Sequence, residues 1–453
     1  MTAALGRAAP GAAVGLFGLL GQGNLGNDAS MEAVLAWLRS EYPCALVDAL
    51  CTGPEQLTAR YGLPATQLRW YTSRRERPKP AAIPLKIAGK IIDARRIISW
   101  VRKHDIVIVP GMGVLEATNL PQGPFQTPYS MFLLSAVGWL SGTTVALVSV
   151  GASVPSSPLT RWFLTSAARL ARYRSYRDEP SKEALRQMGV DTSSDRVYPD
   201  LVFSLPVPDH GSVIANCVGV GVMDYSGSND DRKQGDAIRA AYAANMTAIV
   251  LWLLDKGRTV LLFTGDVHDD AIVQRIVDDV KSVRPALRPS VLTISPASSI
   301  QELMRNMATA EFVIATRYHN VLCGLKLGKP TISIGYGEKF DALMAQMGLA
   351  DFCHSAKAVD LSRLMSQIEL LEGQGARIAD ALAERGAANE RLLAQQFDEL
   401  SDLFRLPPPR RRLGARARRL SSDRIAASPP IRYHGPQLGA PVDDACPGRR
   451  RPT

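Results

Sequence analysis

The short segment from Thr316 to Asn320 combines the residue types best suited to chemistry in this sequence. It follows an apolar run that predicts a buried strand, and it precedes a predicted helix. A helix N-terminus offers unpaired N–H groups and a partial positive charge, to which Arg317 adds a forked guanidinium. We therefore predict an anion-binding site at Thr316 and Arg317, with His319 placed to donate or accept a proton near neutral pH. In the alternative, Arg317 caps the helix or forms an ion pair, and His319 hydrogen-bonds a backbone group.

A second cation, Arg177, stands at the end of another predicted strand, Tyr173–Tyr176, and ahead of another predicted helix. Ligands of open parallel sheets bind beyond the carboxyl ends of the strands, so Arg177 is expected to face a ligand cleft. Asp178 and Ser181 are expected to cap the helix. A surface ion pair between Arg177 and Glu179 is the alternative.

A glycine-rich turn follows the first predicted strand, where Gly21, Gly23 and Gly26 fit the pattern G-x-G-x-x-G. No acidic residue stands securely about 20 positions later, so the resemblance to a dinucleotide-binding turn is weak. Glycines allow a ligand to approach the backbone closely, which makes Asn24 and Asp28 candidate binding residues. The alternative for Asp28 is an N-cap of the following helix.

Two further loops follow predicted strands. Gly111 and Gly113 come directly after the strand Asp105–Val109, and their backbone amides are predicted to meet a ligand at the cleft. A tight turn between strand and helix is the alternative. Lys339 follows the strand Thr331–Gly335 and is a candidate for another cation of the anion site, with an ordinary surface lysine as the alternative.

The elements that must position these residues alternate between short apolar runs and longer helical patterns, which is typical of parallel sheets covered by helices. We predict two Rossmann-like domains, residues 1–205 and 212–376, with a cleft between them. A helix over 377–405 and a disordered Arg- and Pro-rich tail over 406–453 complete the chain. The other strands predicted in the first domain are Ala13–Leu19, Ala45–Leu50, Thr144–Val150 and Val197–Phe203. Those predicted in the second are Cys217–Met223, Thr259–Phe263, Ser290–Ile294 and Glu311–Thr316.

The formal net charge of +10 does not indicate nucleic-acid binding, because most of it belongs to one segment. Residues 407–453 hold 11 Arg and 3 Asp, so the folded part is nearly neutral. The six cysteines show no CxxC pair or metal-type spacing, which predicts reduced thiols, no metal site and a cytoplasmic location. The apolar run Met131–Val150 is interrupted by Gly142, so it predicts a helix, a turn and a strand rather than a membrane span.

Taken together, these segments resemble the polysaccharide pyruvyl transferase family over roughly residues 14–350. The matching features, in chain order, are Asn24-Leu25-Gly26-Asn27-Asp28-Ala29, the glycine loop after Ile106–Val109, Ser175-Tyr176-Arg177-Asp178, Pro199-Asp200-Leu201-Val202-Phe203, Thr316-Arg317-Tyr318-His319 and Gly324-Leu325-Lys326-Leu327-Gly328-Lys329-Pro330. Three segments depart from the family pattern: Tyr318 replaces a more usual Leu, Asn27 precedes Asp28, and Pro110 and Met112 replace glycines.

The resemblance implies the two-domain glycosyltransferase type B fold. It also implies transfer of a pyruvyl unit from phosphoenolpyruvate to two hydroxyls of a sugar, as a cyclic ketal, with release of phosphate. Arg177, Arg317, Thr316 and Lys339 would then bind phosphoenolpyruvate. His319 and Arg317 would be the catalytic residues, with His319 as the acid or base. Loops of the first domain would contact the sugar or glycan acceptor. No redox cofactor is required by this chemistry.

Two other functions stay open at this stage. One is a nucleotide-sugar-dependent glycosyltransferase of the same fold, since fold alone does not determine chemistry. The other is a catalytically silent partner in cell-envelope assembly. Peripheral contact with the anionic inner face of the membrane is a further hypothesis, through the basic tail and the predicted helix Ile87–Lys103. The sequence does not identify the acceptor sugar or the oligomeric state.

Overall fold

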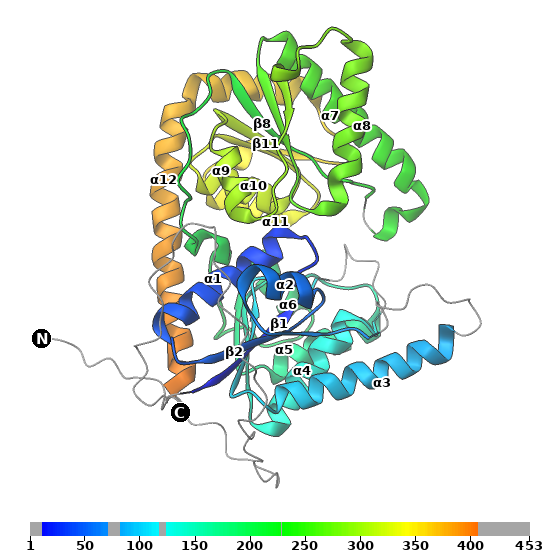
Figure 1. Cartoon of the computed structure of the whole chain (residues 1–453), viewed down its shortest axis with the longest axis vertical. Helices are drawn as coiled ribbons and strands as arrows, with labels where there is room; N and C mark the ends of the chain where they lie inside the picture. Colours follow the sequence, from blue (N-terminus) through cyan, green and yellow to red (C-terminus); the bar gives the residue numbers. More distant parts are fainter. Residues whose placement is uncertain (1–10, 71–81, 117–123, 228, 406–453) are drawn as a thin grey trace, which may run out of the picture.

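The structure, a computed structural model, describes residues 11–70, 82–116, 124–227 and 229–405. The tail predicted to be disordered, residues 406–453, lies outside the described residues, as does its predicted membrane contact. The described chain forms two parallel α/β domains, one above the other in Figure 1. The predicted fold class is confirmed.

The first domain contains a seven-stranded parallel sheet of order β3-β2-β1-β4-β5-β6-β7. Its strands are β1 (Ala13–Gly18), β2 (Leu46–Cys51), β3 (Ala65–Gln67), β4 (Ile106–Pro110), β5 (Thr144–Val150), β6 (Tyr173–Tyr176) and β7 (Arg196–Val197). Its helices are α1 (Leu25–Glu41), α2 (Pro54–Tyr61), α3 (Ala82–Val101), α4 (Thr127–Ser141), α5 (Pro158–Leu170), α6 (Glu179–Gln187) and the 3-10 helix η3 (Leu201–Ser204). The central strands β4 and β5 are buried along their whole length, as expected of a sheet covered on both faces.

The second domain contains a six-stranded parallel sheet of order β10-β9-β8-β11-β12-β13. Its strands are β8 (Cys217–Gly221), β9 (Thr259–Phe263), β10 (Leu292–Ile294), β11 (Phe312–Ala315), β12 (Thr331–Gly335) and β13 (Cys353–Ser355). Its helices are α7 (Gly235–Asp255), α8 (Asp270–Val283), α9 (Ile300–Met307), α10 (Tyr318–Lys326), α11 (Glu338–Gln346) and the 3-10 helices η4 (Asn229–Gln234), η5 (Val267–Asp269), η6 (Pro289–Val291) and η7 (Ala350–Phe352).

The last helix, α12 (Leu361–Arg405), runs along one side of both domains (Figure 1). It starts at Leu361 rather than at the predicted residue 377. Its first part pairs with the second domain, where Glu369 lies 3.0 Å from Lys256 Nζ. Its last part packs on the first domain, where Phe397 stacks on Trp37 with ring centroids 5.3 Å apart. One helix therefore joins the two domains.

The predicted strand Val197–Phe203 is wrong after its first residue. Pro199 lacks the N–H that a ladder needs, and the Asp200 side chain accepts a hydrogen bond from Val202 N at 3.1 Å, which starts η3 instead. The short edge strands β3 and β13 were not predicted from the sequence, because three residues give too little periodicity. The predicted helix, turn and strand over 131–150 are confirmed as α4, a left-handed Gly142 and β5.

Two further findings bear on the cysteines and on membrane spans. Cys51, Cys217, Cys323 and Cys353 are free thiols, but Cys44 is disulfide-bonded, so the prediction that all six are reduced is wrong. Among the described residues, α7 is the one helix long and apolar enough to cross a membrane. Its residues Tyr242, Met246 and Val250 are buried within the second domain, as in a core helix.

Candidate active site

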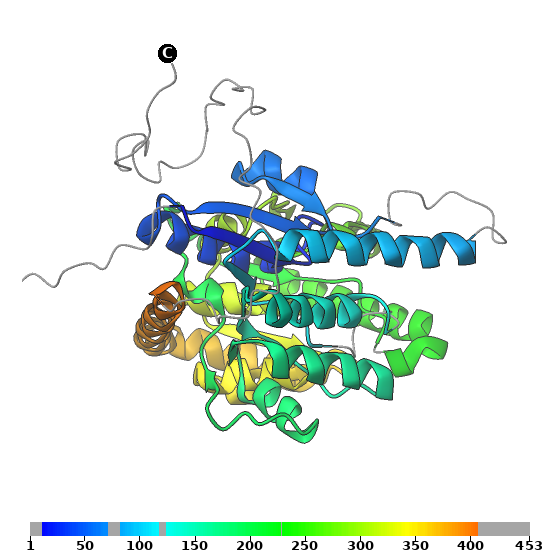
Figure 2. The same ribbon diagram turned by 90° about the horizontal axis from the view of Figure 1, so that it is seen from below.

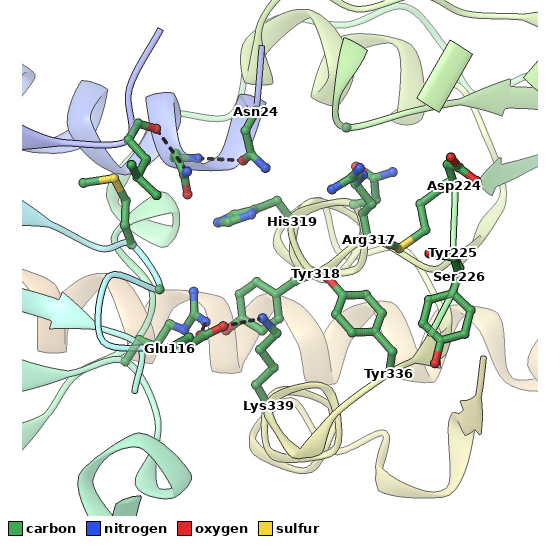
Figure 3. Close-up of a pocket in the computed structure, with 18 of the residues that line it drawn as sticks. Asn24, Glu116, Asp224, Tyr225, Ser226, Arg317, Tyr318, His319, Tyr336 and Lys339 are labelled. Carbon is green, nitrogen blue, oxygen red and sulfur yellow. Dashed lines mark hydrogen bonds and ion pairs between the residues drawn. The ribbon is translucent and has the colours of Figure 1, made fainter. Parts of the chain in front are cut away.

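A cavity of about 360 Å³ lies between the two domains, where the carboxyl ends of both sheets face each other. Each wall is built from the loops that follow strands. The first domain contributes residues after β1, β4 and β6, and the second contributes residues after β8, β9, β11 and β12 (Figure 3). The lining residues used below are Asn24, Gly113, Glu116, Arg177, Asp224, Gly265, Arg317, Tyr318, His319, Asn320 and Lys339.

Asn24 closes one edge of the cavity and joins the domains. Its side chain N-caps α1 by accepting a hydrogen bond from Asn27 N at 3.1 Å. The same amide donates to Asp266 of the second domain at 3.2 Å, while Leu25 N donates to Gly265 O at 3.1 Å. The first turn of α1 is thereby fixed against the second domain.

Glu116 sits between two cations, Arg177 from the first domain and Lys339 from the second (Figure 3). It accepts a close hydrogen bond from Arg177, and its other oxygen lies 3.0 Å from Lys339 Nζ. Burial acts to raise the pKa of Glu116, but Lys339 and Arg177 outweigh it and lower that pKa to about 2. Because the Glu116 carboxylate is paired with two cations, its position in the cavity is suited to binding an anionic group.

The surroundings of Arg177 keep it in position. The residue is only 5% exposed, its guanidinium lies 4.7 Å from the centroid of the Tyr318 ring, and Asp178 and Asp200 lie 3.5 and 3.9 Å from it. The surface pair with Glu179 considered above is replaced by the buried pair with Glu116. Asp178 caps α6 as predicted, through Ser181 N.

Arg317 lines the other end of the cavity and is held by two carboxylates. It donates to both oxygens of the fully buried Asp269, from Nη2 at 2.7 Å and from Nε at closer range, and Asp266 lies 3.7 Å away. Asp269 in turn accepts a hydrogen bond from Asp224 N at 2.9 Å. Arg317 is therefore both an ion-paired residue and part of the cavity wall. Its position is set by the protein before any ligand binds.

His319 lies between the two cationic ends of the cavity. Its Nε2 is buried without a hydrogen-bond partner among the described residues, with Asp200 Oδ2 3.7 Å away. Burial, followed by Arg177, Lys339 and Arg317, lowers the pKa of His319 to about 3, so the ring is neutral at pH 7. Burial raises the pKa of Asp200 to about 6.

Gly26, in the first turn of α1, packs directly against the imidazole of His319. A Cβ placed on Gly26 would lie 1.8 Å from His319 Nδ1 and 2.1 Å from its Cγ. No side chain fits between the helix and the ring. The first domain thus sets the position of a ring that belongs to the second.

Asn320 is a fully buried polar residue whose side chain has no hydrogen-bond partner among the residues that the structure describes. It lines the cavity, is 0% exposed, and neither its amide oxygen nor its amide nitrogen forms a hydrogen bond within the described chain. Gly221 and Gly265 leave room for this amide, since a Cβ on either would lie 3.0 or 2.6 Å from it. Leaving such a group unsatisfied costs about 1–3 kcal/mol, so the site is suited to a polar ligand.

Three residues predicted at the site do not line the cavity. Thr316 is fully buried behind the strand end, where its hydroxyl lies 2.7 Å from that of Tyr242. Asp28 is buried in α1 and accepts a hydrogen bond from Gly21 N at 2.8 Å, which holds the turn; Asn24, not Asp28, is the N-cap. Gly111 adopts a φ of +47° against the side chain of Ser30.

The other predicted residues, Asn24, Gly113, Arg177, Arg317, His319 and Lys339, all reach the cavity. Glu116, Asp200, Asn320 and Gly26 were not predicted as site residues, although Gly26, Asp200 and Asn320 lie in segments that the sequence analysis named. A usable signal existed for Glu116 and Asp200, because each is an acidic residue shortly after an apolar run that ends at the cleft. Within the described ranges, no group of three or more His, Cys, Asp or Glu side chains is arranged to hold a metal ion.

The sequence matches the family described as polysaccharide pyruvyl transferase over residues 24–338. No curated protein matches it. Among solved structures, UDP-GlcNAc 2-epimerase from Neisseria meningitidis, bound to UDP-GlcNAc, is 11% identical with a TM-score of 0.54, over 86% of this chain and 99% of that one. The corresponding epimerase from Methanocaldococcus jannaschii is 9% identical with a TM-score of 0.53, over 79% and 92%. The N-terminal domain of trehalose-6-phosphate phosphatase from Candida albicans is 10% identical with a TM-score of 0.55, over 88% and 97%. At these identities the likeness shows the fold alone, a two-domain arrangement like that of type B glycosyltransferases.

Proposed function

The chain belongs to the polysaccharide pyruvyl transferase family, and from that premise we propose that it transfers the pyruvyl unit of phosphoenolpyruvate to two hydroxyls of a sugar. The product is a cyclic ketal, and phosphate is released. One observation carries the proposal: Arg177, Lys339 and Arg317 converge on a single cavity with a neutral His319 between them. A substrate with a phosphate and a carboxylate needs such an arrangement of cations.

Phosphoenolpyruvate binds, in this proposal, by replacing Glu116. One anionic group of the substrate takes the place of the Glu116 carboxylate between Arg177 and Lys339, and the other lies toward Arg317. Glu116 stands three residues after Gly113, and in this proposal the two move together away from Arg177 and Lys339. Arg177 keeps Asp178 and Asp200 beside it when Glu116 leaves, and Arg317 keeps Asp269, so these two cations need little reorganisation on binding.

His319 supplies the proton that the methylene carbon must receive. Its pKa is lowered by burial and by Arg177, Lys339 and Arg317, and the anionic substrate offsets the contribution of these three cations. Substrate binding therefore raises the pKa of His319 and charges the imidazole where the proton is needed. Asp200, at 3.7 Å from Nε2, stabilises the imidazolium.

Each bond formed in the transfer is matched by a bond broken. The imidazolium protonates C3 to a methyl group, which leaves an oxocarbenium-like C2, and a first sugar hydroxyl adds to C2 and returns a proton to His319. The bond between C2 and the phosphate oxygen breaks, a second hydroxyl of the same sugar closes the ketal, and its proton leaves with the phosphate. The chemistry requires no redox cofactor and no metal. We place it in the cytoplasm, in the synthesis of a cell-envelope or exported glycan.

The test is phosphate release from phosphoenolpyruvate by the purified chain with a panel of sugar and glycan acceptors, followed by mass analysis of the product. Release that depends on the acceptor, with a ketal in the product, supports the proposal. Turnover only with a nucleotide-sugar donor would overturn it in favour of a glycosyltransferase. Arg317→Ala and His319→Ala, if folded, should abolish the release, whereas unaltered cellular function in both variants would indicate a silent partner protein.

A further inference from the structure

The outer face of the first domain carries large apolar side chains exposed to solvent. Phe125, Trp139, Leu140 and Trp162 are 53%, 58%, 56% and 53% exposed. They belong to α4, α5 and the residues just before α4. A folded domain rarely leaves two tryptophans this exposed on neighbouring helices without a partner surface.

These side chains form one continuous face. Helix α4 contacts both α3 and α5, and Figure 2 looks onto the three helices lying side by side. Phe132 joins the two helices at the surface, with its ring centroid 5.0 Å from that of Trp162. Trp139 lies two turns after Phe132 on α4 and so faces the same way.

On α4 and α5 themselves, the charged side chains are all basic. Helix α4 has no charged residue, and α5 has two, Arg161 and Arg169, both exposed, which donate hydrogen bonds to Gln187 O and Gly189 O at the end of α6. In α3 the one acidic residue, Asp93, is buried and lies 3.6 Å from Lys90 Nζ, while Arg95 is exposed. An apolar and aromatic surface bordered by arginines, without an exposed acid on its helices, is complementary to an anionic partner.

We propose that the α4–α5 face, with α3 at its border, docks on the surface of an anionic lipid bilayer. Tryptophan suits the boundary between headgroups and acyl chains, and arginines beside it pair with anionic headgroups. A second copy of the chain fits less well. A twofold contact over this face would bring Arg161 and Arg169 of both copies into one interface, and α4 and α5 offer no carboxylate to pair with them.

Sedimentation of the full chain with vesicles tests the proposal. Vesicles of phosphatidylglycerol and phosphatidylcholine should bind the chain, and vesicles of phosphatidylcholine alone should bind it weakly. High salt should weaken the binding. The double variant Trp139→Ser/Trp162→Ser should bind the anionic vesicles at least about tenfold more weakly, because each exposed indole contributes apolar burial.

The matched control is Leu370→Ser/Leu392→Ser, which removes two exposed leucines of α12, 47% and 40% exposed, and should bind as the unaltered chain does. Equal binding by the tryptophan variant would overturn the proposal. A dimer in sedimentation equilibrium that the tryptophan variant loses would also overturn it, in favour of a contact between copies. Retention of acceptor-dependent phosphate release by the tryptophan variant with a water-soluble acceptor would show that the variant is folded.

Discussion

The contact between Gly26 and the His319 ring gives the sharpest test of the site. Replacing Gly26 by Ala adds one methyl group, whose carbon would lie 1.8 Å from Nδ1, where an ordinary contact begins at 3.4 Å. The ring or the helix must therefore move by about 1.6 Å. The backbone of Gly26 lies in the first turn of α1 and has no positive φ, so alanine is compatible with its conformation.

A displacement of this size should affect catalysis far more than folding. A misplacement of about 1 Å costs on the order of 100-fold in rate, or about 2.7 kcal/mol in the activation free energy. We therefore expect Gly26→Ala to lower kcat/KM for phosphoenolpyruvate at least about 100-fold. The three heavy atoms nearest an added Cβ all belong to His319 and none to Arg177, Lys339 or Arg317, so the Kd for phosphoenolpyruvate should change less than kcat.

The assay is acceptor-dependent phosphate release, with thermal unfolding measured in parallel. Gly386→Ala is the matched control, because Gly386 is also helical and has nothing within 4 Å of an added Cβ. A Gly26→Ala variant with a Tm near that of the unaltered chain and activity within threefold of it would refute the assignment of His319 to the proton transfer.

Four further outcomes follow from the same geometry. Glu116→Gln should tighten phosphoenolpyruvate binding about tenfold in calorimetry, because the competing carboxylate loses its charge; weaker binding would contradict its role as an occupant of the anion site. Asn320→Ala should lower kcat/KM about 10-fold or more without lowering the Tm, since a buried unpaired amide is removed; a large loss of stability would show a structural role instead. Phosphoenolpyruvate binding at about pH 6.5 should take up protons, measured by calorimetry in buffers of different ionisation enthalpy, because the pKa of His319 rises from about 3 on binding. Because the pKa of His319 is about 3 in the folded chain and about 6.5 in the unfolded chain, the unfolded chain binds a proton first as the pH falls. The free energy of unfolding should therefore decrease progressively between about pH 6.5 and pH 3. His319→Gln should lose less of this free energy in that range than the unaltered chain, because it has no imidazole to protonate.

The residue pattern predicted the parts of the fold that local apolar runs encode. The bounds of β5, β6, β9 and β12 agree with the predicted strands, because each is a buried run with a clear end. The end of a parallel strand also locates a cleft, which is why Arg177, Arg317 and Lys339 could be nominated from the sequence.

What the sequence could not give was the side of each turn that faces the cleft. Asp28 and Thr316 directly adjoin the cavity-lining residues Asn27 and Arg317, yet their own side chains point into the protein. The bridge from Arg177 through Glu116 to Lys339 joins two domains and depends on how they pack, which no local pattern encodes. Pro199 interrupts an apolar run that otherwise predicts a strand.

The position of α12 determines when the first domain can complete its packing during synthesis on the ribosome. Trp37 of the first domain is covered by Phe397, and Ser149 of the same domain hydrogen-bonds Gln396 at 3.1 Å. These partners are translated only after the whole second domain has emerged. The first domain, although made first, therefore completes its own surface last, and its apolar face around Trp37 stays open to chaperones throughout that interval.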